Sequence, residues 1–188
     1  MLVESNRNIL IGTVGYHNLC NHSIGPILIS NLREMDWPER VTIEEMNWGP
    51  IAIVQQFQAM AEPYDRVVLL VAVERPKRSI GELTLFRWTG ELPDKTKIQA
   101  CIGDAVTGVI SVENLLVIGE FFQIWPKEVF LLDVEPGPEQ AGMELSAELK
   151  NRVPEILQAI QRVSLEGTPV IEDWPLFGSD PSWATQNN

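Results

Sequence analysis

The chain has 188 residues, of which 45% are hydrophobic and 21% are charged, and its formal net charge is -12. This composition is typical of a single globular domain, and the excess of acidic residues argues against nucleic acid or an anionic membrane as a partner. The first residues lack the basic and apolar pattern of a signal peptide, and no apolar run is long enough for a membrane span, so we expect a cytoplasmic protein.

Strand and helix signals alternate along the chain. Continuous apolar runs predict strands buried on both faces, and alternation in GELTLFRW predicts a half-exposed strand that could lie at a sheet edge. Apolar residues at helical spacing predict the helices. In chain order we expect a strand at 8–14, a helix at 24–35, a strand at 41–46, a helix at 50–61, strands at 66–73 and 81–88, a helix at 112–124, a strand at 128–134 and a helix at 146–163.

Polar residues and prolines mark several of these boundaries. Ser23 and Ser111 each stand immediately before a predicted helix, where a hydroxyl can cap the first turn. Pro154 lies inside the last helix and predicts a kink. Residues 89–109 show no clear pattern.

This order of elements predicts an α/β fold. We expect a three-layer α/β/α sandwich, in which a twisted, mostly parallel sheet of about five strands has helices on both faces. A single domain is expected over residues 1–167, followed by a Trp- and Pro-rich tail over 168–188. Ligands of such sheets bind at the carboxyl ends of the strands, so the candidate positions for the site are Gly15 onward, 46–49, 73–75 and 135–137.

One short loop between the first strand and the first helix holds both histidines of the chain. His17, Cys20 and His22 form an H-x2-C-x-H pattern, whose donors suit nickel, zinc or copper. Alternatively, the histidines are edge or cap residues of an ordinary α/β turn, and the cysteine is a small apolar filler. A Cys–His or Ser–His–Asp catalytic arrangement would need one of these histidines as its base, but nothing indicates an oxyanion hole or an orienting acid.

Several landmarks, in their order and spacing, resemble the hydrogenase maturation endopeptidases, which trim the C-terminal extension from the large-subunit precursor of nickel–iron hydrogenases. The resemblance covers most of residues 8–163. Gly15 and Gly25 flank the first loop as in the family, and the run at 67–73 is followed by Gly81. In the C-terminal half, the segments WPKEVFLLDVEP, GMELS and VP are similar to the family's last strand, turn and terminal helix.

The resemblance also implies a metal-recognition site. The family is expected to recognise the nickel of the precursor through a carboxylate before the first helix, an aspartate at the end of the central strand and a histidine before the next helix. In this sequence these positions fall on His22, on Val71, and on or near Gly108. Valine and glycine side chains offer no ligating atom. The metal site that the resemblance implies therefore cannot work here as inherited.

A rebuilt metal site is the alternative. It would use His22, His17 and Cys20 from the first loop, with carboxylates from Glu74 and Asp104 near the same crevice. Nickel or zinc would suit these donors. Without such a rebuilt site, we expect no cofactor.

Two further segments could contact a partner. Arg75, Lys77 and Arg78 form a basic group directly after the central strand, where we expect a solvated loop or a contact with an acidic or C-terminal peptide. Trp174 belongs to the aromatic tail, which either packs back on the body or docks on a partner.

Three functions follow from these patterns. We expect a divergent, non-catalytic protein resembling the maturation endopeptidases, which acts as a protein-binding accessory or regulatory factor. The first alternative is an active metal-dependent endopeptidase that trims a hydrogenase large-subunit precursor through a rebuilt site at His22. The second is a small-molecule binding module that uses the crevice at the strand ends. The expected partner is a protein, such as a hydrogenase large subunit or another precursor.

Overall fold

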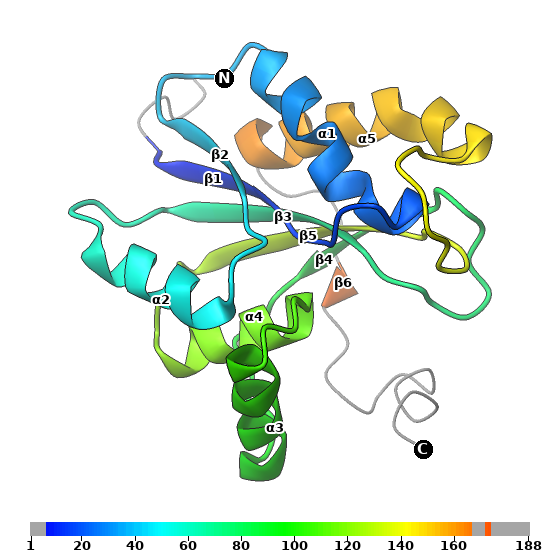
Figure 1. Cartoon of the computed structure of the whole chain (residues 1–188). Helices are drawn as coiled ribbons and strands as arrows, with labels where there is room; N and C mark the ends of the chain where they lie inside the picture. Colours follow the sequence, from blue (N-terminus) through cyan, green and yellow to red (C-terminus); the bar gives the residue numbers. More distant parts are fainter. Residues whose placement is uncertain (1–6, 167–171, 174–188) are drawn as a thin grey trace.

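The protein is built on one six-stranded sheet (Figure 1). The computed structural model describes residues 7–166 and 172–173. The strands are β1 (Ile9–Thr13), β2 (Val41–Glu45), β3 (Arg66–Ala72), β4 (Leu83–Arg87), β5 (Glu128–Val134) and the short β6 (Glu172–Asp173). Their order across the sheet is β2-β1-β3-β5-β4-β6, and every neighbouring pair is parallel except β4 and β5. The predicted mostly parallel sheet is confirmed.

Helices cover both faces of the sheet and complete the predicted α/β sandwich. Figure 1 shows α1 and α5 on one side and α2, α3 and α4 on the other. The helices are α1 (Ile24–Glu34), α2 (Pro50–Ala59), α3 (Lys95–Val106), α4 (Val112–Phe121) and α5 (Ala147–Glu166), and a 3-10 turn, η1 (Cys20–Ser23), precedes α1. In the described part of the chain, no helix is long and apolar enough to cross a membrane.

The central strand β3 divides the hydrophobic core into two layers. Val67 and Leu69 pack in the layer that contains α2 and α4, while Val68 points into the layer that contains α1 and α5. All three side chains are buried. Because successive side chains of a strand point to opposite faces, a strand covered on both faces needs a continuous apolar run, and that is the pattern from which β3 was predicted.

Two local predictions are corrected, and a helix is found in a segment whose sequence shows no clear pattern. The strand expected at a sheet edge, β4, instead lies between β5 and β6, with Phe86 paired to Glu172. Residues 89–109 contain α3, whose N-cap Asp94 accepts a hydrogen bond from the Lys97 amide. Ser23 is the N-cap residue of α1, but its hydroxyl accepts a hydrogen bond from the Leu19 amide, so it closes the preceding turn rather than capping the helix.

Other boundaries agree with the sequence. Ser111 precedes α4, and its hydroxyl accepts a hydrogen bond from the Asn114 amide. Pro154 lies inside α5 as expected. The tail predicted over 168–188 lies outside the described residues, apart from the backbone of β6, and Trp174 is among the residues not described.

Candidate functional site

A cleft of about 560 Å³ opens at the carboxyl ends of β1 and β3. From β1 the chain crosses to β2 on one side and then back to β3 on the other side of β1, so the strand order reverses here, and such switch points are where open α/β sheets bind ligands. The cleft therefore lies at two of the four strand ends that the sequence offered as candidates, and no residue of 46–49 or 135–137 lines it. Its polar lining includes His22, Glu74, Lys97, Asp104, Glu113, Asn114 and Glu139.

His22 is the only residue of the H-x2-C-x-H pattern among those that line the cleft. Its Nε2 atom lies 3.0 Å from the carbonyl oxygen of Gly137 and 3.2 Å from Oε1 of Glu74. The carbonyl can only accept a hydrogen bond, so Nε2 carries the proton and donates it. A protonated Nε2 cannot ligate a metal, and only Nδ1 is left for that role.

The other two residues of the pattern point elsewhere. His17 is largely exposed, and its Nε2 atom pairs with Oε1 of Glu45 at 2.5 Å. Cys20 lies against Gly142, where an added Cβ would come within 2.5 Å of its Sγ atom. Within residues 7–166, no group of three or more His, Cys, Asp or Glu side chains could hold a metal ion. The first loop therefore does not gather its donors into a site.

The same loop instead ties the N-terminal half of the protein to the turn after β5. Asn21 is buried, and its Nδ2 atom donates to the carbonyl of Pro136 at 2.9 Å and to the hydroxyl of Ser146 at 3.2 Å. Its Oδ1 atom accepts from the Ser146 amide at 2.8 Å. Leu19 and Gly142 form an isolated parallel bridge beside it. This role of Asn21 was missed, because its partners lie more than a hundred residues away in the sequence.

The two remaining positions assigned by the resemblance offer no ligand. Val71 is 1% exposed and belongs to the apolar wall of the cleft. Gly108 follows α3 with a positive φ of 84°, and an added Cβ there would meet no atom within 4 Å. Asp104, four residues earlier, does line the cleft, with its Oδ2 atom 3.5 Å from Nδ2 of Asn114. Of the ligands proposed for a rebuilt site, the carboxylates of Glu74 and Asp104 and the imidazole of His22 share the cleft without forming a common ligand set.

The most unusual group of the cleft is Glu113, in the first turn of α4. It is 8% exposed, and burial raises its pKa from 4.5 to about 7, although the Ser111 hydroxyl and the Arg75 charge oppose this shift. Its Oε2 atom accepts a hydrogen bond from Ser111 at 2.9 Å, and its Oε1 atom has no hydrogen-bond partner among the described residues. We did not predict this residue, although one acidic residue in the apolar run VENLLVIG was a signal that could have indicated it.

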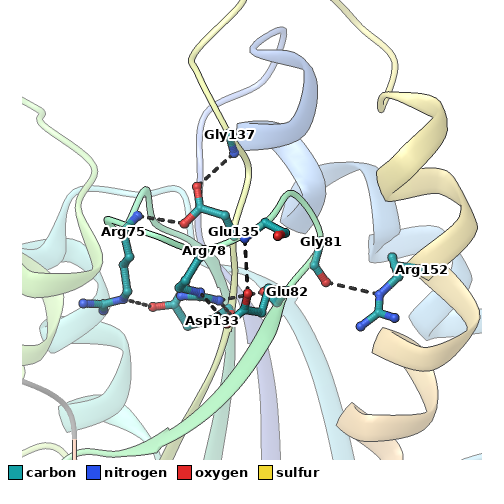
Figure 2. Close-up of polar contacts among 9 residues, drawn as sticks. Arg75, Arg78, Gly81, Glu82, Asp133, Glu135, Gly137 and Arg152 are labelled. Carbon is teal, nitrogen blue, oxygen red and sulfur yellow. Dashed lines mark hydrogen bonds and ion pairs between the residues drawn. The ribbon is translucent and has the colours of Figure 1, made fainter.

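The basic group after β3 is not the solvated loop that we expected. Figure 2 shows Arg75 and Arg78 both pointing at Asp133 of β5. Nε of Arg75 donates to Oδ2 of Asp133 at 2.7 Å, and Nη1 of Arg78 donates to Oδ1 at 3.1 Å. Asp133 is fully buried, and the two arginine side chains are 7% and 10% exposed. Of the three basic residues, only Lys77 is exposed.

Glu135 extends this network along β5. Its Oε2 atom accepts from the Arg75 amide at 2.7 Å, and its Oε1 atom accepts from the Gly137 amide at 3.1 Å (Figure 2). Burial raises the pKa of Asp133, and the charges of Arg75 and Arg78 oppose that shift. We call Arg75, Arg78, Asp133 and Glu135 the arginine network. It fixes the connection between β3 and β4 onto β5.

Comparison with solved structures shows that this architecture is that of the hydrogenase maturation endopeptidases. The hydrogenase maturating endopeptidase HybD from Escherichia coli is 19% identical, with a TM-score of 0.60 over 85% of this chain and 95% of that chain. A solution structure of an endopeptidase from Escherichia coli is 19% identical, with a TM-score of 0.62 over 88% and 97%. The hydrogenase 2 maturation peptidase from a Thaumarchaeota archaeon, also 19% identical, has a TM-score of 0.58 over 84% and 97%.

These likenesses extend over most of each chain. They confirm the resemblance predicted from the sequence at the level of the fold. No protein-family model matches the sequence, and no curated protein matches it. Since one fold can carry unrelated functions, the function must be argued from the residues of the cleft.

Proposed function

We propose that this chain is a non-catalytic, protein-binding relative of the hydrogenase maturation endopeptidases, acting in the cytoplasm as an accessory or regulatory factor. The observation that supports this best is the wall of the cleft. Val71 and Gly108 stand at two of the three positions that the resemblance assigns to metal recognition, and neither side chain can ligate a metal. His22, at the third position, donates a hydrogen bond from Nε2 to the carbonyl oxygen of Gly137.

Exposed apolar side chains around the cleft support a protein as the ligand. Tyr16 and Val109 line the cleft and are 42% and 39% exposed. Trp48 and Val106 are also exposed, at 59% and 77%. Aromatic residues are enriched in protein interfaces, and apolar side chains that stay exposed together indicate a docking surface. Because the structural neighbours are named as maturation proteases of hydrogenases, the partner that we propose is a hydrogenase large-subunit precursor or another precursor protein.

A metal-dependent endopeptidase is the second candidate, because His22, Glu74 and Asp104 line one cleft. Nickel or zinc would be its metal. The residues do not fit this role well, since His22 offers only Nδ1 and no third donor converges with Glu74 in the described chain. The cleft volume would also suit a small organic ligand, and stabilisation in a thermal-shift screen of metabolites would favour that third function.

The test combines binding and processing. Purified protein is mixed with a hydrogenase large-subunit precursor that keeps its C-terminal extension. Complex formation is followed by size-exclusion chromatography with light scattering, and the precursor's C-terminus is read by intact mass. We expect a complex and an untrimmed precursor. Trimming that is lost in His22→Ala but kept in His17→Ala would overturn the proposal in favour of the endopeptidase.

Calorimetric titration with Ni²⁺ and with Zn²⁺ tests the metal separately. The proposal expects no stoichiometric binding that depends on His22. One equivalent of metal, bound by the wild type and by His17→Ala but not by His22→Ala, would show that the site has been rebuilt.

In the binding experiment, absence of a complex with the precursor would remove this partner class from the proposal.

A further inference from the structure

The inner end of the cleft holds a carboxyl group that the fold leaves half unpaired. Glu113 lines the cleft, is 8% exposed, and has one oxygen without a hydrogen-bond partner among the described residues. A buried acceptor without a donor costs free energy, more so when the group is charged. A ligand that brings an N–H donor into the cleft would remove this cost.

Charge around the cleft points to the kind of donor. Glu74, Asp104 and Glu139 contribute three more carboxyl groups to the lining, and all three residues are exposed. Lys97 is the single lysine among the lining residues, which include no arginine. Carboxylates concentrated in a cleft attract a cation and disfavour an anionic ligand.

Exposed apolar side chains at the rim are the basis for placing the cation on a larger partner. The hydroxyl of Tyr16 accepts a hydrogen bond from the Ile110 amide at 2.8 Å, which places this ring beside Val109. Gly49 approaches the carbonyl of Ala105, since an added Cβ would lie 3.9 Å from that oxygen, and the residues next to these two in the sequence, Trp48 and Val106, are exposed. Apolar anchors next to an acidic cleft are complementary to a peptide segment that alternates basic and apolar residues.

We propose that the cleft binds a basic segment of a partner protein, with an arginine or lysine side chain that reaches Glu113. This inference rests on the protein-binding role proposed above and names the chemistry of the partner segment. Because Oε1 of Glu113 is itself buried, the side chain turns toward the cleft to accept from the cationic nitrogen, and the exposed carboxylates at the mouth of the cleft attract the flanking basic residues. The apolar rim packs against the intervening side chains.

Binding of this kind depends on pH with a defined sign. The charged and titratable groups nearest Glu113 are Arg75 after β3, Asp133 of β5, and Cys101 and Asp104 of α3, while His22, Glu74, Lys97 and Glu139 line the rest of the cleft. Burial raises the pKa of the Cys101 thiol, which therefore stays neutral at pH 8. A cation favours the ionised form of Glu113, whose pKa is about 7. Affinity therefore falls roughly tenfold between pH 8 and pH 6, and binding at pH 7 releases about half a proton per peptide bound.

The test uses fluorescence polarisation with three labelled peptides, capped at both ends: hexaarginine, hexacitrulline and hexaglutamate. Citrulline keeps the shape of arginine and removes its charge. At about 150 mM salt, where long-range attraction is screened, we expect the wild-type protein to bind hexaarginine but neither hexacitrulline nor hexaglutamate. Glu113→Gln should bind it at least tenfold more weakly and without the pH dependence. The matched control is Glu39→Gln, an exposed glutamate before β2, at the opposite end of the sheet from the cleft, which should bind as the wild type does.

Several results would overturn the inference. Equal losses in Glu113→Gln and Glu39→Gln, or no loss in either, would show non-specific attraction to an acidic protein. Affinity that rises at low pH, or binding of hexaglutamate, would show that a protonated Glu113 receives an acidic ligand. Thermal unfolding of each variant establishes that the chain is folded. If the precursor still binds while hexaarginine does not, the proposed function stands and this inference fails; the reverse result leaves this inference standing and removes the precursor as partner.

Discussion

Two buried carboxyl groups on the same side of the sheet have opposite surroundings. Asp133 follows Val129 and Leu131 on the α4 face of β5, and two arginines reach it. Glu113 enters this region from α4 and receives one hydrogen bond, from Ser111. Both are buried, so burial does not distinguish them. They differ in the number of hydrogen-bond partners. Two arginines donate to Asp133, whereas one oxygen of Glu113 has no partner among the described residues and can accept from a ligand.

The largest effect is expected when the satisfied carboxylate is removed. Asp133→Ala leaves two buried guanidinium groups without the carboxylate that they share, so the free energy of unfolding should fall by about 3–5 kcal/mol. Urea denaturation followed by circular dichroism measures this loss. A loss below about 1 kcal/mol would mean that the arginine network does not hold the β3–β4 connection. Asp133 would then not differ from Glu113 in how much its partners stabilise the fold.

The second prediction concerns pH. Because the pKa of Glu113 is raised to about 7 in the folded state, stability is lost as pH rises from the unfolded pKa toward and through 7. Between pH 5 and pH 8 the wild type should lose about 2–3 kcal/mol more of its unfolding free energy than Glu113→Gln does. Denaturation series at both pH values measure the difference. If the unfolding free energies of the two proteins changed equally with pH, folding would not raise the pKa of Glu113.

The third prediction isolates the one partner that Glu113 has. Ser111→Ala removes the helix cap and the hydrogen bond to Oε2, at a cost of about 1 kcal/mol in unfolding free energy. Since that bond lowers the pKa of Glu113, its removal should raise the pKa further. Carboxyl ¹³C NMR titration measures the pKa. Ser30→Ala, at an exposed position of α1, is the control and should change neither quantity.

The smallest effect is expected at the exposed border of the arginine network. Glu82 lies 3.9 Å from Nε of Arg78 and is 49% exposed. Glu82→Gln should change the unfolding free energy by less than about 1 kcal/mol, and this small change should shrink in high salt. Chemical denaturation at two salt concentrations measures it. A loss comparable to that of Asp133→Ala would mean that the network depends on its surface and not on its buried centre.

Most of the fold was predictable because its signals are local. The apolar run of β5 gave its bounds, 128–134, and the prolines and capping residues located most helices. The alternation in GELTLFRW described one face of β4 correctly but could not show that Glu172 and Asp173 would pair beside it. Helix α3 was missed since its sequence has a weak apolar stripe, although Asp94 was a usable cap signal.

The chemistry of the site was less predictable, because it depends on distant pairings. Arg75 and Arg78 look like a solvated basic loop until Asp133, 58 and 55 residues away, is placed between them. Glu113 becomes unusual only when its helix is buried on all sides. His17, Cys20 and His22 share a pattern in the sequence, but the turn of the chain sends their side chains in different directions.

The hydrogen bonds that Asn21 makes from the first loop bear on the order in which the chain folds during synthesis. The bonds of this side chain join residues separated by 115 and 125 positions, and the carbonyl that holds His22 belongs to Gly137. A chain emerging from the ribosome can complete the helices around β1 early, but it has no partner for this loop until three quarters of the sequence has been translated. The position of this loop at the cleft is therefore fixed only after β5 and the turn that follows it have been made.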